Sequence, residues 1–347
     1  MPSLSTDAPA GRPLVAATPM AFVRAITQAF ALRGLSPQAA LEAAQIAPAD
    51  VERADGRITA LQMEWLSAAA MQALDDEALG WFSRPLPWGS YGLLARASLS
   101  APTLGIALKR WCRHHGLLTR DITLAVQVQG NEAAIVLTEH LPPGGDGALR
   151  EFCCVSVLRN AHGLACWFVD SRIPLRDAGF AFGAPPHADA YGVLFDGPTH
   201  FEADQTAIRF DARYLDLPVK RDEAAMNQML QRALPIQVRP YRRDRLLVQR
   251  VRQLLLTQPQ DTRNADDLAA LLHTSARSLH RQLKEEGATL QALKDEVRRE
   301  RAMGLLQRSS KPVKQVAEAA GFQNEKSFIR AFKGWTGMTP GDWRGQR

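Results

Sequence analysis

The sequence contains few cysteines and lacks the short motifs of the common enzyme and nucleotide-binding classes. Its 347 residues include only four cysteines, Cys112, Cys153, Cys154 and Cys166. Their spacing forms neither a zinc-ligand set nor a CxxC redox pair. We expect buried free thiols in a reducing cytoplasm, and a redox-sensing thiol is the alternative. The eight histidines show no metal-ligand spacing, and no GxSxG, P-loop or GxGxxG pattern is present. The sequence therefore predicts no catalytic site, no metal ion and no cofactor.

A hydrophobic run that would direct secretion or cross a membrane is also lacking. The first 13 residues are rich in Pro, Ala and Ser without an apolar core. We therefore expect residues 1–17 to form a disordered tail and not a signal peptide. The most apolar run, residues 152–169, contains Arg159, Asn160 and His162, which favour a buried helix over a membrane span. We expect a cytoplasmic protein without membrane contact.

Acidic residues are scarce in the last third of the chain. The formal net charge is +6, but from Arg239 onward 22 Lys and Arg stand against 12 Asp and Glu. The preceding part has 20 basic and 24 acidic residues. Because a basic segment neutralises phosphates and releases their counterions, we expect nucleic acid to bind the C-terminal third. The acidic remainder argues against a second nucleic-acid surface.

Two segments of the basic third have the pattern of a helix-turn-helix unit. In the later one, apolar residues recur at helical spacing over residues 313–320, and Gly321 ends this helix. Asn324 can cap a second helix, in which Phe328 and Phe332 face inward and leave a polar, basic outer face. This plan is typical of a DNA-reading helix-turn-helix.

The same plan occurs earlier, over residues 264–287. Asn264 can cap a first helix, His273 and Thr274 form the turn, and Ser275 can cap a second helix. Residues 289–307 predict one longer helix between the two units. If both recognition helices enter successive major grooves, they lie about 34 Å apart, one turn of DNA.

These segments resemble the DNA-binding domain of the AraC/XylS family of bacterial transcription regulators. The residues that carry the resemblance are Ser275–Leu283, Ala320–Phe322, Phe328–Lys333, Gly337–Pro340 and Arg344. The resemblance implies these DNA-binding residues: Ser275, Arg277, Ser278, His280, Arg281, Gln323, Asn324, Glu325, Lys326, Ile329, Arg330 and Lys333. Ile329 departs from the small polar residue often found at its position, and it could contact a thymine methyl group. For any single residue of this set, a solvated surface side chain is the alternative.

Residues 18–233 show a mixture of helical and strand patterns. Alternating apolar and polar residues over 121–128 and 132–138 predict a β-hairpin around residues 129–131. Further short strands are predicted over 180–182, 192–195 and 207–210, and a buried helix over 151–169. We therefore expect an α+β N-terminal sensor domain over 18–233 and a linker over 234–243. An all-α DNA-binding domain follows over 244–347, with two helix-turn-helix units joined by a long helix.

Two stretches of the N-terminal half, residues 89–115 and 191–218, also resemble a known domain. It is the arabinose-binding-type N-terminal domain of a large AraC subgroup that includes regulators of ornithine utilisation. The resemblance implies a sensory role, but not a sugar ligand. It thus implies a non-enzymatic transcription regulator that binds double-stranded DNA and a small-molecule effector. A homodimer is the expected assembly, and RNA polymerase is a further candidate partner.

Two alternatives remain open at this point. An architectural DNA-binding protein with a structural N-terminal domain would bind many sequences with similar affinity and bend them. An N-terminal domain that only dimerises or docks another protein would show no saturable binding of small molecules.

Overall fold

The chain divides into two compact units, Met1–Asp244 and Arg245–Arg347. The computed structural model describes residues 16–140, 147–231, 234, 246–259, 261–262, 264–309 and 311–345. Strand β1 (Ala16–Pro19) includes Ala16 and Ala17, so the expectation of a disordered tail was wrong for these two residues. Of the predicted linker, only Leu234 lies within the described residues.

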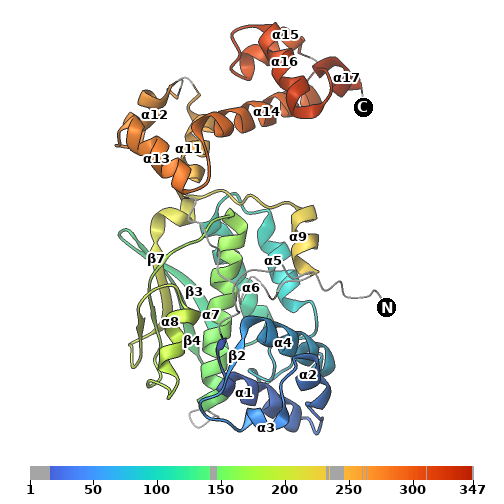
Figure 1. Cartoon of the computed structure of the whole chain (residues 1–347), viewed down its shortest axis with the longest axis vertical. Coiled ribbons are helices and arrows are strands. Elements are labelled where there is room, and N and C mark those ends of the chain that lie inside the picture. Colours follow the sequence, from blue (N-terminus) through green and yellow to red (C-terminus); the bar gives the residue numbers. More distant parts are fainter. Residues whose placement is uncertain are drawn as a thin grey trace. The chain divides into compact units, whose positions relative to one another are not determined.

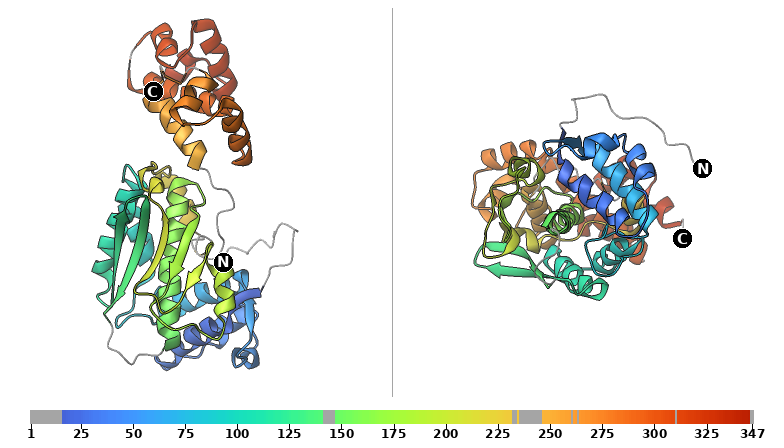
Figure 2. Two further views of the ribbon diagram at one scale, coloured as in Figure 1. Left: turned by 90° about the vertical axis from the view of Figure 1, so that its left-hand side faces the viewer. Right: turned by 90° about the horizontal axis from the view of Figure 1, so that it is seen from below.

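Helix α7 is central in the first unit and packs against helices α1 and α6 and against strands β4 and β7 (Figures 1 and 2). Their bounds are α1 (Met20–Ala31), α2 (Gln38–Ala43), α3 (Pro48–Val51), α4 (Ala60–Leu74), α5 (Ser90–Leu99), α6 (Leu104–Leu118), α7 (Gly147–Val169), α8 (Tyr191–Leu194) and α9 (Glu223–Leu230). Short 3-10 helices lie at Ala188–Ala190 and Ala212–Asp216. Strand β1 pairs with β2 (Arg57–Thr59) in a small antiparallel sheet. By length and apolar composition α7 could cross a membrane, but 78% of its most apolar window is buried inside the unit. It is therefore a core helix, as predicted.

The main sheet has five strands in the order β3-β4-β7-β5-β6. Their bounds are β3 (Ile122–Gln129), β4 (Glu132–Glu139), β5 (Leu175–Gly179), β6 (Thr199–His200) and β7 (Thr206–Asp211). All neighbouring pairs are antiparallel except β5 and β6, which are parallel. The predicted hairpin is confirmed as β3–β4, and the strand predicted at 207–210 lies inside β7. The prediction for 192–195 was wrong, because Tyr191 and Leu194 bury their side chains three residues apart on helix α8.

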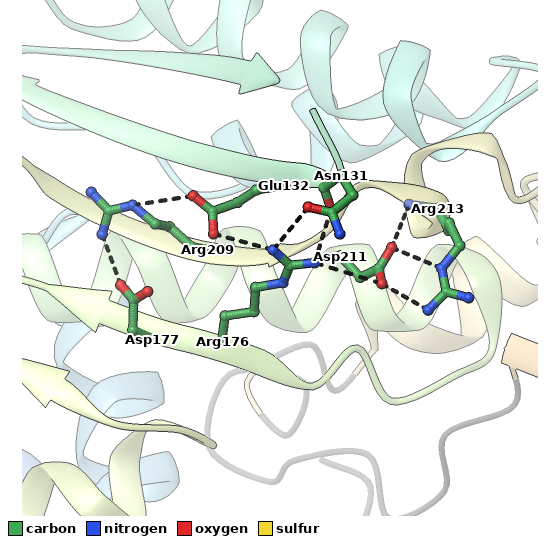
Figure 3. A network of polar contacts seen from close by, with 7 residues as sticks. All are labelled: Asn131, Glu132, Arg176, Asp177, Arg209, Asp211 and Arg213. Carbon is green, nitrogen blue, oxygen red and sulfur yellow. Dashed lines mark hydrogen bonds and ion pairs between the residues drawn. The ribbon is translucent and has the colours of Figure 1, made fainter. Parts of the chain in front are cut away.

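Ion pairs run across one face of this sheet (Figure 3). Arg209 of β7 donates to Asp177 of β5 at 2.7 Å, and Arg176 lies 3.4 Å from Glu132 of β4. Arg176 also donates to the main-chain oxygen of Asn131 at 3.0 Å. Partly exposed pairs of this kind contribute little stability one by one. Because they join three adjacent strands, they favour the observed strand register.

The second unit consists of seven helices in its described part. They are α11 (Leu246–Thr257), α12 (Ala265–Leu271), α13 (Ala276–Glu285), α14 (Leu290–Arg308), α15 (Val313–Ala319), α16 (Glu325–Thr336) and α17 (Pro340–Gly345). Leu279 and Leu283 of α13 lie in one hydrophobic core, and Phe328 and Phe332 of α16 lie in another. The predicted joining helix is α14, which begins after the N-cap Thr289 and is about 28 Å long at 1.5 Å per residue. The predicted α+β domain followed by a helical domain is confirmed.

Helix α14 belongs to both cores of the second unit. Leu290, Leu293 and Val297 in its first half pack in the core that contains α11, α12 and α13. Ala302 and Leu306 in its second half pack in the core that contains α15 and α16. A single continuous helix therefore fixes both helix-turn-helix units to one axis.

Candidate DNA-binding surface

The first recognition helix, α13, begins at a hydrogen-bonded turn. The main-chain amide of Thr274 donates to the carbonyl of Ala269 at 2.9 Å, and His273 between the helices has φ +53°. Ser275 accepts from the amide of Ser278 at 3.2 Å and so caps α13. His273 is exposed, and a second local hydrogen bond, from its own amide to the carbonyl of Ala270 at 3.1 Å, holds it in this left-handed conformation. The capping predicted for Ser275 is confirmed.

Helix α13 separates its apolar and basic faces cleanly. Leu279 and Leu283 have no exposed surface, whereas Arg277, His280 and Arg281 are exposed. The Arg281 guanidinium pairs with the exposed Glu285 at 2.8 Å. An exposed i, i+4 pair is weak, so a base or phosphate can displace this carboxylate. Ser275 and the partly buried Ser278 instead hydrogen-bond to each other at 3.0 Å at the start of the helix.

The second recognition helix, α16, has the same construction with a glycine turn. Gly321 adopts φ +83°, a conformation that costs glycine nothing. Asn324 accepts from the amide of Ser327 at 2.8 Å and so caps α16 as predicted. The exposed residues of the predicted set here are Gln323, Asn324, Glu325, Lys326, Arg330 and Lys333. Phe328 and Phe332 are fully buried beneath them.

Ile329 lies at the edge of this outer face. The sequence placed it among the exposed residues, but the structure shows it partly buried and packed against the core of the second helix-turn-helix unit. Its remaining surface lines a shallow hollow with Lys326, Arg330 and Lys333. The Ile329 side chain therefore packs against the core on one side and lines the hollow on the other. A small polar residue would not make this apolar contact with the core.

Basic residues of α14 extend the surface in a way that the sequence analysis missed. Lys294, Arg298 and Arg301 line a groove that reaches Gln323 and Asn324 at the start of α16. The Arg298 guanidinium lies 5.3 Å from the centre of the Phe322 ring, a cation–π contact. Burial, and then the charge of Arg298, lower the pKa of Lys294. In the sequence, Lys294, Arg298 and Arg301 are spaced four and three residues apart on one predicted helix, and this spacing could have indicated that they share a face.

No metal-ligand cluster accompanies this surface in the part of the chain that the structure describes. No group of three or more His, Cys, Asp or Glu side chains there is arranged to hold a metal ion. The four cysteines are buried free thiols. Burial raises the pKa of Cys112 to about 12, so that thiol is protonated at neutral pH and a poor nucleophile.

Comparison with known proteins identifies the two units. Residues 34–219 match the N-terminal arabinose-binding domain of AraC transcription regulators. Residues 268–346 match a helix-turn-helix domain. The chain belongs to the AraC family of transcription regulators. It is a DNA-binding regulator, and the family resemblance noted in the sequence is confirmed.

Relatives of this AraC-family chain are named as transcription regulators. It is 30% identical to the ornithine utilization regulator of Pseudomonas aeruginosa over 329 residues, 94% of this chain and 96% of the relative. It is 26% identical to the regulator VqsM of the same species over 267 residues, 73% and 79% of the two chains.

Solved structures of regulators also resemble the chain. Regulator CdpR from P. aeruginosa is 21% identical with a TM-score of 0.34, covering 94% of this chain and 98% of that one. The AdpA DNA-binding domain in complex with a target DNA is 26% identical with a TM-score of 0.26, covering 29% and 90%.

Proposed function

We propose that this regulator reads a specific two-part DNA site through α13 and α16 and that its N-terminal unit senses a small effector. The observation that carries the first part is the sharing of α14 between the two helix-turn-helix cores. A continuous helix resists bending, so it limits how far the two recognition helices can move independently. Two half-sites at a defined spacing are the expected target, in successive major grooves about 34 Å apart.

Roles on the DNA follow from the exposure of each side chain. Arg277, His280 and Arg281 on α13 would meet base edges in one groove. Glu325, Lys326, Ile329 and Arg330 on α16 would do so in the next, with Arg330 suited to guanine and Ile329 to a thymine methyl group. Ser275, Ser278, Gln323, Asn324 and Lys333 would contact phosphates or hold the helix starts.

Basic residues outside the recognition helices would strengthen this binding without selecting a sequence. The groove residues Lys294, Arg298 and Arg301 place positive charge next to the start of α16. Contacts to phosphates make affinity depend strongly on salt concentration. We propose domain limits of 18–233 and 244–347, with residues 234–243 as the linker.

The effector part of the proposal is supported by the match to the arabinose-binding domain of AraC regulators over residues 34–219. An effector that binds two conformations with different affinity would shift the population of DNA-competent molecules. Because one relative is named for ornithine utilisation, amino acids are the first class to screen. We further propose a cytoplasmic homodimer that acts on RNA polymerase at its promoters.

The decisive experiment selects bound sequences from a random DNA pool with the purified full chain at physiological salt. A motif of two halves about one helical turn apart is the expected result. The control is the double variant Arg277→Ala/Arg330→Ala, which should lose the motif but keep salt-dependent nonspecific binding. Diffuse enrichment by the parent, with and without an amino-acid mixture, would contradict sequence-specific reading. It would support an architectural protein instead, and specificity ratios at fixed salt would measure this directly.

A further inference from the structure

Helix α7 of the N-terminal unit carries a polar stripe on an otherwise buried surface. Between Glu151 and Val169, every residue is buried except Ser156, Arg159 and His162, which are partly exposed. Residues three apart in a helix lie on the same side, so these three side chains line one edge of α7. The core helix of the unit therefore turns one polar edge toward solvent.

Arg159 differs from the other partly buried arginines of this unit. Arg33 pairs with Asp76 at 2.6 Å, and Arg221 pairs with Asp170 at 2.7 Å. Arg159, in contrast, has no hydrogen bond or ion pair with the residues that the structure describes, from 16 to 140 and from 147 to 231. Arg24 and Arg110 are also partly buried without an ion pair, but they donate to the carbonyl of Val51 at 2.9 Å and to the hydroxyl of Ser100 at 3.0 Å.

The neighbours of Arg159 leave it as the only formal charge of the stripe. The Nε2 atom of His162 lies 2.7 Å from the carbonyl oxygen of Ile173, and burial lowers the pKa of this imidazole, so it is neutral at pH 7. The nearby carboxylate of Asp196 already accepts from both Nε and Nη2 of the Arg172 guanidinium. Burial lowers the pKa of Arg159 to about 10, yet the group remains charged at neutral pH.

A partly buried guanidinium without a counter-charge loses part of its hydration without a compensating partner, which lowers the stability of the folded protein. A carboxylate or phosphate can remove that cost, because a guanidinium offers paired N–H donors that match either group. We propose that Arg159, beside Ser156 and His162, binds the carboxylate or phosphate group of a small anionic effector. This inference rests on the proposed effector-sensing function and narrows it to anionic ligands.

The test uses the full chain and small probes that carry only the recognised group. Thermal unfolding of the N-terminal unit is followed against increasing acetate, inorganic phosphate or neutral acetamide at constant ionic strength. We expect Tm to rise along a saturating curve with acetate or phosphate, by roughly 3–6 °C at twenty times Kd, and to stay constant with acetamide. The response to acetate compared with phosphate distinguishes the two anionic groups.

Variants connect that response to Arg159. Arg159→Met should abolish the anion response and, without anion, should unfold at the same or a higher temperature than the parent, because it removes an unpaired charge. Arg159→Lys should keep a saturable response with several-fold weaker affinity, since an ammonium cannot pair bidentately. The matched control Arg113→Met, an exposed arginine of α6, should respond as the parent does.

Three outcomes would overturn the site. They are no saturable anion response in the parent, an equal response in Arg159→Met, or a lower Tm of Arg159→Met without anion. If Arg159→Met does not fold, an unchanged affinity in Arg159→Lys would also contradict bidentate binding. None of these measurements involves DNA, so they separate the failure of this site from the failure of DNA reading.

Discussion

Arg301 donates through Nη2 to the carbonyl oxygen of Leu256 at 3.0 Å, and its Nη1 lies 3.5 Å from the carbonyl oxygen of Ala319. Leu256 is in the last turn of α11 and Ala319 ends α15, so both oxygens lack partners within their own helices. A cation is also favoured at a helix C-terminus. One side chain of the joining helix therefore completes a helix end in each helix-turn-helix unit.

Removing the hydrogen bonds of Arg301 should loosen the two helix-turn-helix units relative to each other. We expect Arg301→Met to lower the free energy of unfolding by about 1 kcal/mol, as for a charge-assisted hydrogen bond near the surface. Affinity for a two-part DNA site should fall more than affinity for a single half-site, because the spacing is no longer held. Denaturation would measure the free energy of unfolding, and fluorescence anisotropy would measure the affinity for DNA.

The control for this prediction is Arg299→Met, which changes an exposed neighbour on α14. If Arg301→Met lost the same amount of affinity for the two-part site as for the single half-site, Arg301 would have no positioning role.

Arg330 should contribute sequence specificity through α16. Arg330→Ala is expected to weaken binding to the selected DNA site by about 1–3 kcal/mol and to relax the preference at one base pair. Titration of a set of single-substituted DNA duplexes would locate that base pair. Lys314→Ala, an exposed change on α15, should leave the base preferences unchanged. Full affinity in Arg330→Ala would mean that the outer face of α16 does not enter the groove.

Glu286 ties the first helix of the DNA-binding unit to the recognition helix α13. Its carboxylate accepts from the amides of Leu247 at 3.1 Å and Val248 at 2.7 Å, at the start of α11. Glu286→Ala should lower the free energy of unfolding by roughly 0.5–2 kcal/mol, as other lost helix caps do. Chemical denaturation would measure it against Glu285→Ala, whose carboxylate makes only an exposed pair. If Glu286→Ala and Glu285→Ala lowered the free energy of unfolding by the same amount, the cap by Glu286 would contribute nothing to stability.

His115 should make the N-terminal unit sensitive to acid. It is fully buried beside Tyr91 and Trp111, and burial lowers its pKa from 6.5 to about 4. Between these values the unfolded chain binds a proton that the folded chain does not, so stability falls as pH drops from about 6.5 to 4. The loss is on the order of 3 kcal/mol.

The variant His115→Gln tests this pH dependence. It cannot be protonated in this range, so its unfolding free energy should fall less steeply with acid than that of the parent. Denaturation at a series of pH values would show the difference. His280→Gln, which changes an exposed histidine, should follow the parent. Parallel curves for the parent and His115→Gln would exclude His115 as the source.

The helix-turn-helix elements could be predicted because their signals are local. Asn264, Ser275, Thr289 and Asn324 each cap the helix that follows, and their side chains reach amides only three residues away. The β3–β4 hairpin was predictable for the same reason, since its pairing depends on one turn at Gly130. The helix α8 was missed, because four residues make only about one helical turn and are too few to show a helical repeat of apolar residues.

The sequence by itself determined the helix ends, the hairpin, the basic character of the C-terminal third and the family, because these depend on neighbouring residues and on composition. Only the tertiary structure decided which polar groups meet across long separations. It brought Arg301 to the ends of two helices, placed Ile329 partly in a core, and left Arg159 without a partner among the described residues. Such contacts depend on how whole elements pack, and no local pattern in the chain encodes which charge finds its counter-charge.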